Sequence, residues 1–338
     1  MKKSLLALAV LGAFAGVASA QSSVTIYGIA DAGLSRETGA TSGSIVKLAT
    51  GVQSGNRLGF RGTEDLGGGL KANFQLESGF NLDDGASRQG ALFGRQAWVG
   101  LNGGFGAVSM GRQYSLVFLA LDTVDPFDYG LTGAISNLVV DAPFRINNSI
   151  KYSSPTVGGF TGEAMYGFGE VPGNNSASRQ YELAAKYAKG PVFVQLAHNN
   201  AQNVTGTDAL KITALAASYD FGVAKAAFSY NVNKNAATID SADVMVGVTV
   251  PFGASTILAS YIRKNDKTAA NADASQAAIG YTYALSKRTN LYTSYSRISN
   301  KNSAKYTVGD ASGGGALAAD RLPGTASTGF AVGVRHRF

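Results

Sequence analysis

The chain has 338 residues, of which 45% are hydrophobic and 15% charged, with no cysteine and a formal net charge of +7. After the N-terminal segment, the sequence has no uninterrupted apolar run of about 18 residues, which excludes transmembrane helices. The mean hydropathy of +0.03 is also too polar for a helical membrane protein. The basic excess is mild and contains no basic run, so nucleic acid is not an expected partner. The lack of cysteine excludes disulfides.

Residues 1–20 have the pattern of an export signal. Lys2 and Lys3 form a positive start, Leu5–Val17 is an apolar core, and Ala18–Ala20 is a small-residue cleavage site. The core is too short for a membrane helix, and the cleavage site follows it directly. We therefore expect the signal to be removed, which lowers the net charge by the two lysines, from +7 to +5.

Short clusters rich in glycine, proline, asparagine and aspartate punctuate the rest of the chain. Each is flanked on both sides by about ten residues of alternating character, the length that crosses a bilayer at a tilt. Longer polar stretches, such as Arg263–Asp273 and Lys301–Thr325, lie between them. The pattern predicts β-hairpins with tight turns at one end and long loops at the other. The seven tight-turn signals are Glu64–Gly69, Asn102–Gly104, Ser154–Gly159, Lys189–Pro191, Asp220–Gly222, Pro251–Gly253 and Leu285–Arg288.

The seven turns join fourteen strands, and a first strand near Val24–Asp31 and a last strand at Ser327–Phe338 make sixteen. Both ends of the sheet then lie on the tight-turn side, as an even number requires. The last strand has one apolar and one polar face, which fits a barrel in lipid, where every edge is paired. We predict an all-β fold over residues 21–338: a 16-stranded antiparallel transmembrane β-barrel with an aqueous lumen.

Strict alternation supports this prediction in several segments. Leu70–Phe80, Gln180–Tyr187 and Ser275–Tyr283 each carry apolar residues on one parity and mostly polar or small residues on the other. In the first of these, Glu77 falls on the polar face. One strand, Phe93–Leu101, cannot be phased, because Trp98 and its apolar neighbour fall on opposite parities.

The widest gap between turns holds an extra segment at about residues 113–144. Its run Leu116–Leu121 is more apolar than a solvent loop should be, and three aspartates follow. A long apolar loop needs a place to bury itself. Folding into the lumen would bury it and narrow the pore. An extracellular flap or a contact with a neighbouring subunit remains an alternative.

Seven segments along the chain match a known family. RGTEDLGGGLKA at Arg61–Ala72 and LSKRT at Leu285–Thr289 are the most specific matches. On these residues the chain resembles the general trimeric porins of beta-proteobacteria, of the neisserial and Burkholderia type. The matching segments are Ser22–Leu34, Asn56–Phe80, Phe93–Leu101, Phe105–Tyr114, Asn147–Pro155, Ala284–Tyr292 and Gly333–Phe338.

The resemblance implies a homotrimer of sixteen-stranded barrels in the outer membrane of a Gram-negative bacterium, with the third loop folded into the channel. Lipid, lipopolysaccharide and the barrel assembly machinery would then be its partners. That machinery is expected to read the terminal aromatic strand through Phe338. His336 stands where many such barrels have an aromatic residue, which leaves the terminal signal intact.

Basic side chains are predicted on the pore wall. Arg57 has the opposite parity to Leu58, and Arg145 the opposite parity to Ile146, which shares its parity with Ile150. An arginine facing lipid near the midplane would cost about 2–4 kcal/mol, so both are expected to face the wet lumen. The resemblance, not the pattern, adds Arg95 to this basic wall.

The resemblance also implies that the basic wall faces acidic residues of the infolded loop. Asp122, Asp125 and Asp128 supply that side here, and Glu77 lies on a lumen-facing position. The acidic loop of neisserial porins carries a different local motif. Opposed charges in a narrow neck orient dipolar solutes and disfavour apolar ones.

The predicted function is passive diffusion of ions and small hydrophilic solutes, with a weak preference for anions. A solute-specific channel is the nearest alternative, and a barrel adhesin would need an appended domain or fewer strands. An outer-membrane enzyme is disfavoured, because the sequence has only two histidines, His198 at the start of a loop and His336 on an outward parity. Neither has a nucleophile at a motif spacing. No cofactor or metal is expected.

Overall fold

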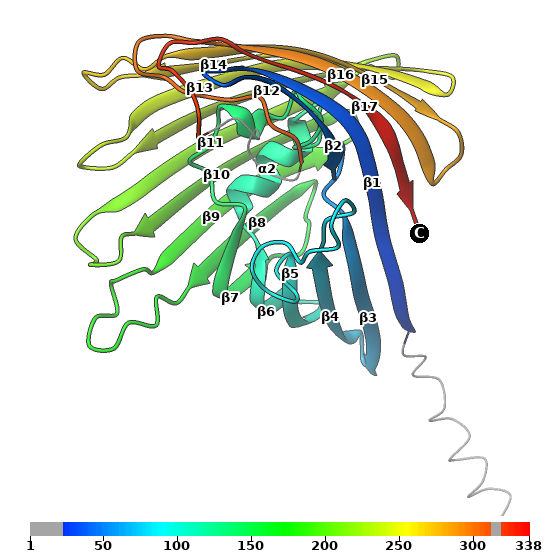
Figure 1. Ribbon diagram of the computed structural model, residues 1–338. Coiled ribbons are helices and arrows are strands. Elements are labelled where there is room, and N and C mark those ends of the chain that lie inside the picture. Colours follow the sequence, from blue (N-terminus) through cyan, green and yellow to red (C-terminus); the bar gives the residue numbers. More distant parts are fainter. Residues whose placement is uncertain (1–22, 312–318) are drawn as a thin grey trace, which may run out of the picture.

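The computed structural model describes residues 23–311 and 319–338, which form one closed antiparallel sheet around a short helix (Figure 1). The predicted export signal lies outside the described residues. The strands are β1 (Ser23–Ala40), β2 (Gly43–Thr50), β3 (Arg57–Gly67), β4 (Leu70–Gly79), β5 (Gln96–Gly103), β6 (Gly106–Tyr114), β7 (Arg145–Ser153), β8 (Phe160–Gly167), β9 (Gln180–Lys189), β10 (Val192–Gln202), β11 (Ala209–Asp220), β12 (Lys225–Lys234), β13 (Asp240–Phe252), β14 (Ser255–Asp266), β15 (Ala274–Ala284), β16 (Thr289–Asn300) and β17 (Ser327–Arg337).

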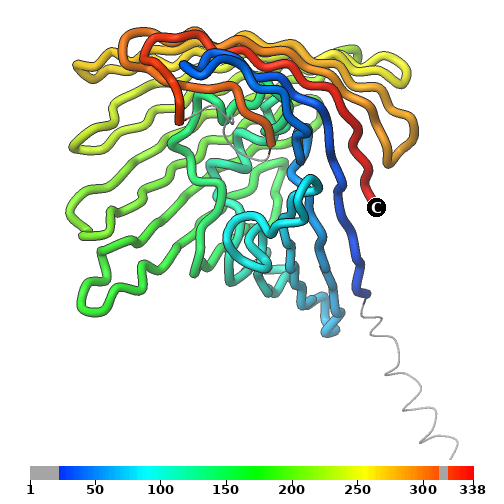
Figure 2. Tube along the Cα trace, viewed as in Figure 1, coloured from blue at the N-terminus to red at the C-terminus, as the bar shows by residue number. Residues whose placement is uncertain are grey.

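The first strand closes the barrel. One edge of β1 pairs with β17, from Ile29↔Arg337 to Thr38↔Thr328. Its other edge pairs with β3 near its start and with β2 near its end. Since β2 and β3 share that edge, they occupy one strand position, which the segment Gly51–Asn56 interrupts. The 17 strands of the sheet therefore fill sixteen positions around the barrel, as predicted, and Figure 2 shows the trace of the barrel wall.

The alternation of the strands separates an apolar outer face from an inner face. On β17, Phe330, Val332 and Val334 are exposed, whereas Ala331 is buried. This is the parity expected for a lipid-facing surface. On β5 the structure resolves the phase: Val99 is exposed on the outside, and the Trp98 indole N–H donates to Gln96, a residue of the same parity. Among the described residues, no helix is both long enough and apolar enough to cross a bilayer.

Each predicted tight turn joins two neighbouring strands. Gly67, Gly68 and Gly69, between β3 and β4, have φ angles of 84°, 60° and 81°, a region that other residues rarely adopt. Glycine in this region costs no steric energy, so the turn can reverse the chain within a few residues. The glycine clusters therefore predicted these turns for a physical reason.

The segment between β6 and β7 holds the helix α2 (Leu116–Val124) and the short helix η1 (Ile135–Asn137). Two groups fix the start of α2. The Ser115 hydroxyl accepts the N–H of Phe118 at 2.9 Å, and the Glu182 carboxylate of β9 accepts the N–H of Leu116. Both satisfy N–H groups that a helix leaves unpaired in its first turn.

Apolar side chains cover most of the surface of α2, a pattern that requires burial on several sides. The helix contacts β9, β10, β11 and β12. It packs in one apolar cluster with Ala197, Ile212, Ala214 and Ala216, wall residues whose parity is opposite to that of the exposed Leu196 and Leu215. Figure 1 shows α2 within the curve of the sheet.

The rest of this segment is hydrogen-bonded to later strands. The Asn137 amide donates to Gln276 of β15 at 2.9 Å, and the Thr132 N–H donates to Ser294 of β16 at 3.2 Å. Lys264 of β14 pairs with Asp141 at 3.0 Å. The segment is therefore attached along β9–β16 and does not form a flap free of the wall.

Three local predictions are wrong. Ile146 was expected on the outer parity, but it is buried in the cluster around α2, because an irregularity in β6–β7 pairing, near Asn148 with φ 48°, shifts the alternation. His198 lies inside β10 instead of opening a loop, and it bonds to Thr213 of β11. The first strand continues past Asp31 to Ala40 and returns as β2.

Candidate functional site

A cavity of about 590 Å³ lies between the basic wall and the loop that carries α2. The start of β3, the residue before β5, the end of β6 and the start of β7 line one side. The loop that carries α2 and residues 305–311 of the last long loop line much of the rest, together with Ser54, Gly55 and Gln89. The charged lining residues are Arg57, Arg95, Arg145, Lys305, Asp122, Asp128 and Asp310.

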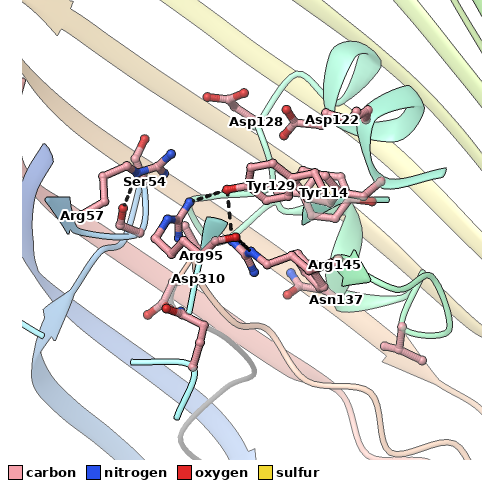
Figure 3. A pocket seen from close by; sticks show the side chains of 18 of the residues that line it. Ser54, Arg57, Arg95, Tyr114, Asp122, Asp128, Tyr129, Asn137, Arg145 and Asp310 are labelled. Atoms are coloured by element: carbon pink, nitrogen blue, oxygen red, sulfur yellow. Dashed lines mark hydrogen bonds between the residues drawn. The ribbon is translucent and has the colours of Figure 1, made fainter. Parts of the chain in front are cut away.

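Arg95 is the centre of the basic wall (Figure 3). Its Nε donates to the Glu77 carboxylate at 2.7 Å, and its Nη2 donates to the Tyr114 hydroxyl at 2.8 Å. Arg145 donates from Nη2 to the same hydroxyl at 3.0 Å and from Nε to the Arg95 carbonyl at 2.6 Å. The guanidinium of Arg145 also lies 4.6 Å from the centre of the Tyr114 ring. These bonds hold the two guanidiniums in fixed positions.

Arg57 completes the basic wall. Its Nε donates to the Gly55 carbonyl at 3.0 Å, and its Nη1 lies 4.0 Å from Glu77. Glu77 also accepts the Tyr27 hydroxyl at 2.8 Å, and its side chain is only 3% exposed. One buried carboxylate thus serves two guanidiniums, so the wall retains positive charge toward the cavity.

Asp122 and Asp128 lie on the loop side of the cavity, across from Arg57 and Arg95 (Figure 3). Burial and, to a lesser extent, the charges of Asp128 and Asp125 raise the pKa of Asp122 to about 7, despite the lowering effect of Arg57 and Arg95. At neutral pH the Asp122 carboxyl is therefore only partly ionised, which weakens the acidic side.

Asp125 was expected to face the basic wall, and the structure contradicts this. Its carboxylate accepts the N–H groups of Phe127, Tyr129 and Ile135, each at 3.0 Å. Burial raises its pKa to about 6, and these three hydrogen bonds oppose that rise. Asp125 therefore shapes the loop after α2, and its charge is used inside the loop.

Four aromatic rings connect the basic wall to the loop. Tyr114 stacks on Phe118 with ring centres 4.8 Å apart, and Phe118 contacts Tyr129 and Phe144 at 4.7 and 5.2 Å. Since Tyr114 also binds two arginines, the rings fix the distance between the basic wall and α2.

Two parts of the site were not predicted from the sequence. In the segment Gly51–Asn56, the N–H groups of Gln53 and Ser54 donate to Asp31 at 2.9 and 2.7 Å, and the Val52 carbonyl accepts the N–H of Leu131. This brings Ser54 and Gly55 to the cavity. The sequence signal for this turn was Asp31 on an inward parity, followed by a segment bounded by glycines.

The last long loop is the second missed part. Lys305, Thr307 and Asp310 line the cavity, and the Gly309 N–H donates to Asn137 at 3.0 Å. Lys47 pairs with Asp310 at 3.9 Å. No local pattern marks such contacts, because they join residues far apart in the sequence. Within residues 23–311 and 319–338, no group of three or more acidic or histidine side chains is placed to hold a metal ion.

A closed barrel with a charged internal cavity agrees with the comparisons to known proteins. The family model described as Gram-negative porin matches residues 7–303. The chain belongs to this family. It is similar to outer membrane porin protein 32 of Delftia acidovorans, 36% identical over 357 residues, and to an outer membrane porin protein of Bordetella pertussis, 34% identical over 403 residues. Both alignments cover the whole of each chain.

Solved structures agree. The anion-selective porin from Comamonas acidovorans is 32% identical, with a TM-score of 0.84, covering 94% of this chain and all of that one. The trimer form of OmpT from Vibrio cholerae, 18% identical with a TM-score of 0.69, shares the fold. The protein is thus a porin of the Gram-negative outer membrane, a passive diffusion channel and not an enzyme.

Proposed function

We propose that the cavity is the constriction of a pore with a weak preference for anions, and that residues 113–144 form the constriction loop. The observation that carries this proposal is the imbalance of charge on the wall. Arg57 and Arg95 share Glu77, and within the described residues Arg145 has no carboxylate partner within salt-bridge distance. Lys305 adds a fourth cation to the lining.

The acidic groups compensate this charge only in part. Asp122 and Asp128 face the cavity, Asp125 is used inside the loop, and Asp310 lies beside Lys47. An excess of fixed cations in a narrow, water-filled neck raises the local concentration of anions. Charges on opposite sides also create a transverse field that favours dipolar solutes over apolar ones. The similar structure from Comamonas acidovorans is that of an anion-selective porin, which supports the same sign of selectivity here.

Reversal potentials in a salt gradient across a planar bilayer test the selectivity. The unmodified protein should prefer chloride to potassium, and Arg57→Ala with Arg145→Ala should reduce that preference and raise the conductance. Arg263→Ala is the matched control, because Arg263 is exposed and does not line the cavity. Cation preference at neutral pH in the unmodified protein would refute the proposal.

We also propose that the porin is a homotrimer that buries the face of β1–β5. The exposed large apolar residues of these strands are mainly aliphatic, including Ile26, Val46 and Val99. From β7 to β16 the exposed face instead carries many tyrosines, such as Tyr181 and Tyr261, which suit lipid interfaces. Native mass spectrometry should give three copies. Val46→Arg should yield monomers, and Val246→Arg, on the opposite face, should not.

We also propose how the chain is exported and assembled. Cleavage after Ala20 is expected to give Gln21 as the first residue, which N-terminal sequencing checks.

The backbone of Phe338 exchanges two hydrogen bonds with Gly28, at 3.0 and 3.1 Å, and its ring is exposed. The ring is therefore accessible to the assembly machinery. Phe338→Ala should lower the amount of folded porin in the membrane, whereas Phe330→Ala on the same strand should lower it less. Lipid and lipopolysaccharide are the proposed surroundings.

A further inference from the structure

The wall of the cavity is not polar throughout. Val140 and Phe144, both on the loop between η1 and β7, line it and are 53% and 42% exposed. Leu119 of α2 lines it too and is half-buried. Apolar side chains on the outer face of a barrel contact lipid, but these face the same cavity as the arginines. Their exposed area is apolar surface that an apolar group of a solute can cover.

The basic groups lie next to this apolar surface. Arg145 follows Phe144 directly in the chain, and the Phe144 ring contacts Phe118, whose ring stacks on Tyr114. The hydrogen bonds that Arg145 makes to described residues start at Nε and Nη2. A guanidinium has five N–H donors, so donors remain for a carboxylate.

We propose that Val140, Phe144 and Arg145 form a subsite for aromatic monocarboxylates, and that it retains them more strongly than small carboxylates of the same charge. This inference depends on the proposed pore function of the same cavity. The carboxylate pairs with Arg145, and the flat ring covers Val140 and Phe144. A flat ring suits the site because arginine and aromatic faces both stack on rings. The cavity of about 590 Å³ has room for a small solute together with water.

Block of the chloride current in planar bilayers tests the subsite. The probes are benzoate and acetate, which share one charge and differ in the ring. The benzoate concentration that halves the current should be at least about fivefold lower than the acetate concentration that does so. A fivefold difference is the effect expected when a few tens of Å² of apolar surface are covered. Cyclohexanecarboxylate should block more weakly than benzoate.

In the double variant Val140→Ser with Phe144→Ser, the ratio of the half-blocking concentration of acetate to that of benzoate should fall close to one. The matched control is Val204→Ser with Phe168→Ser, the same changes at exposed loop residues that do not line the cavity, and it should keep the ratio of the unmodified protein. Val140→Ser alone changes only the more exposed residue, and it replaces the double variant in the test if the double variant fails to fold. The single variant should lower the ratio in part.

Three results would overturn the subsite: equal block by benzoate and acetate in the unmodified protein, equal block by benzoate and cyclohexanecarboxylate, or a ratio that both Val140→Ser variants leave unchanged. In each case the channel still conducts chloride. If the purified, folded porin forms no conducting channel, the proposed pore function fails instead, so the two failures are distinguishable.

Discussion

The two halves of the barrel interior use the same inward parity for different purposes. On β3–β7 the inward positions carry charges and polar groups around the cavity, such as Arg57 and Glu77. On β9–β12 the inward positions include Ala197, Ile212 and Ala214, all buried beneath α2. The loop thus divides the interior into a wet half and a covered half.

This difference shows that inward parity alone does not predict contact with water. In the wet half, charged residues such as Arg57 and Asp128 line the cavity, whereas a charge in the covered half must be paired within the protein. Glu182, for example, is fully buried and accepts bonds from Leu116 and Asn199. The covered half therefore positions the loop, and the wet half is the part that contacts solutes.

A charge placed in the covered half should break this division. Ala214→Arg puts a guanidinium into the apolar cluster beneath α2. An uncompensated buried charge costs on the order of several kcal/mol, which the protein can avoid only by releasing the loop. We expect a large drop in the apparent unfolding temperature and a higher single-channel conductance.

The control places the same side chain in the wet half. In the unmodified protein the Ser153 hydroxyl donates to the Glu163 carboxylate at 3.0 Å. In Ser153→Arg the new guanidinium therefore has a carboxylate partner close by. This variant should leave the unfolding temperature nearly unchanged. Equal losses in both variants would show that the two halves do not differ in the way described.

Removing the anchor of α2 should have the next largest effect. Glu182→Ala leaves the N–H of Leu116 and the Asn199 amide without their acceptor. An unsatisfied buried donor costs about 1–3 kcal/mol, so stability against urea should fall by that order. Glu163→Ala removes an inward carboxylate from β8, which pairs with Lys186 at 4.0 Å. Because that pair is longer and partly exposed, the loss there should be much smaller; a loss as large as for Glu182 contradicts the anchor.

The sequence predicted the features that depend on local chemistry. Glycine clusters such as Gly67–Gly69 predicted turns because few other residues reach positive φ, and alternation predicted the inward side of Arg57 and Glu77. Period-two patterns hold wherever a strand is regular, and this covers most of the barrel.

Features that depend on irregular or distant contacts were not predictable. The shift near Asn148 reverses the parity that the sequence assigns to Ile146, yet Arg145 still reaches the cavity, because it bonds to Tyr114 and Arg95. Asp125 looked like its neighbours Asp122 and Asp128, and only the folded loop shows that its carboxylate is used internally. No local pattern records such pairings.

The smallest expected effect concerns the pH dependence of the wet half. Asp122 faces Arg57 and Arg95, with Asp128 beside it and Asp125 inside the loop. Since burial raises the pKa of Asp122 to about 7, its carboxyl is charged at pH 8 and mostly neutral at pH 6. Loss of this negative charge as the pH falls leaves the arginines less compensated, so the preference for anions should increase.

Reversal potentials at pH 8 and pH 6 measure this change in anion preference. Asp122→Asn should abolish most of the change. Asp125 has a pKa of about 6, but its carboxylate is buried and bonded within the loop, so its contribution should be small and should persist in Asp122→Asn. Apart from that small contribution of Asp125, the variant at pH 8 should match the unmodified protein at pH 6. A full pH response in Asp122→Asn would assign the titration to another group, with Asp128 as the first to test, because burial also raises the pKa of that carboxyl.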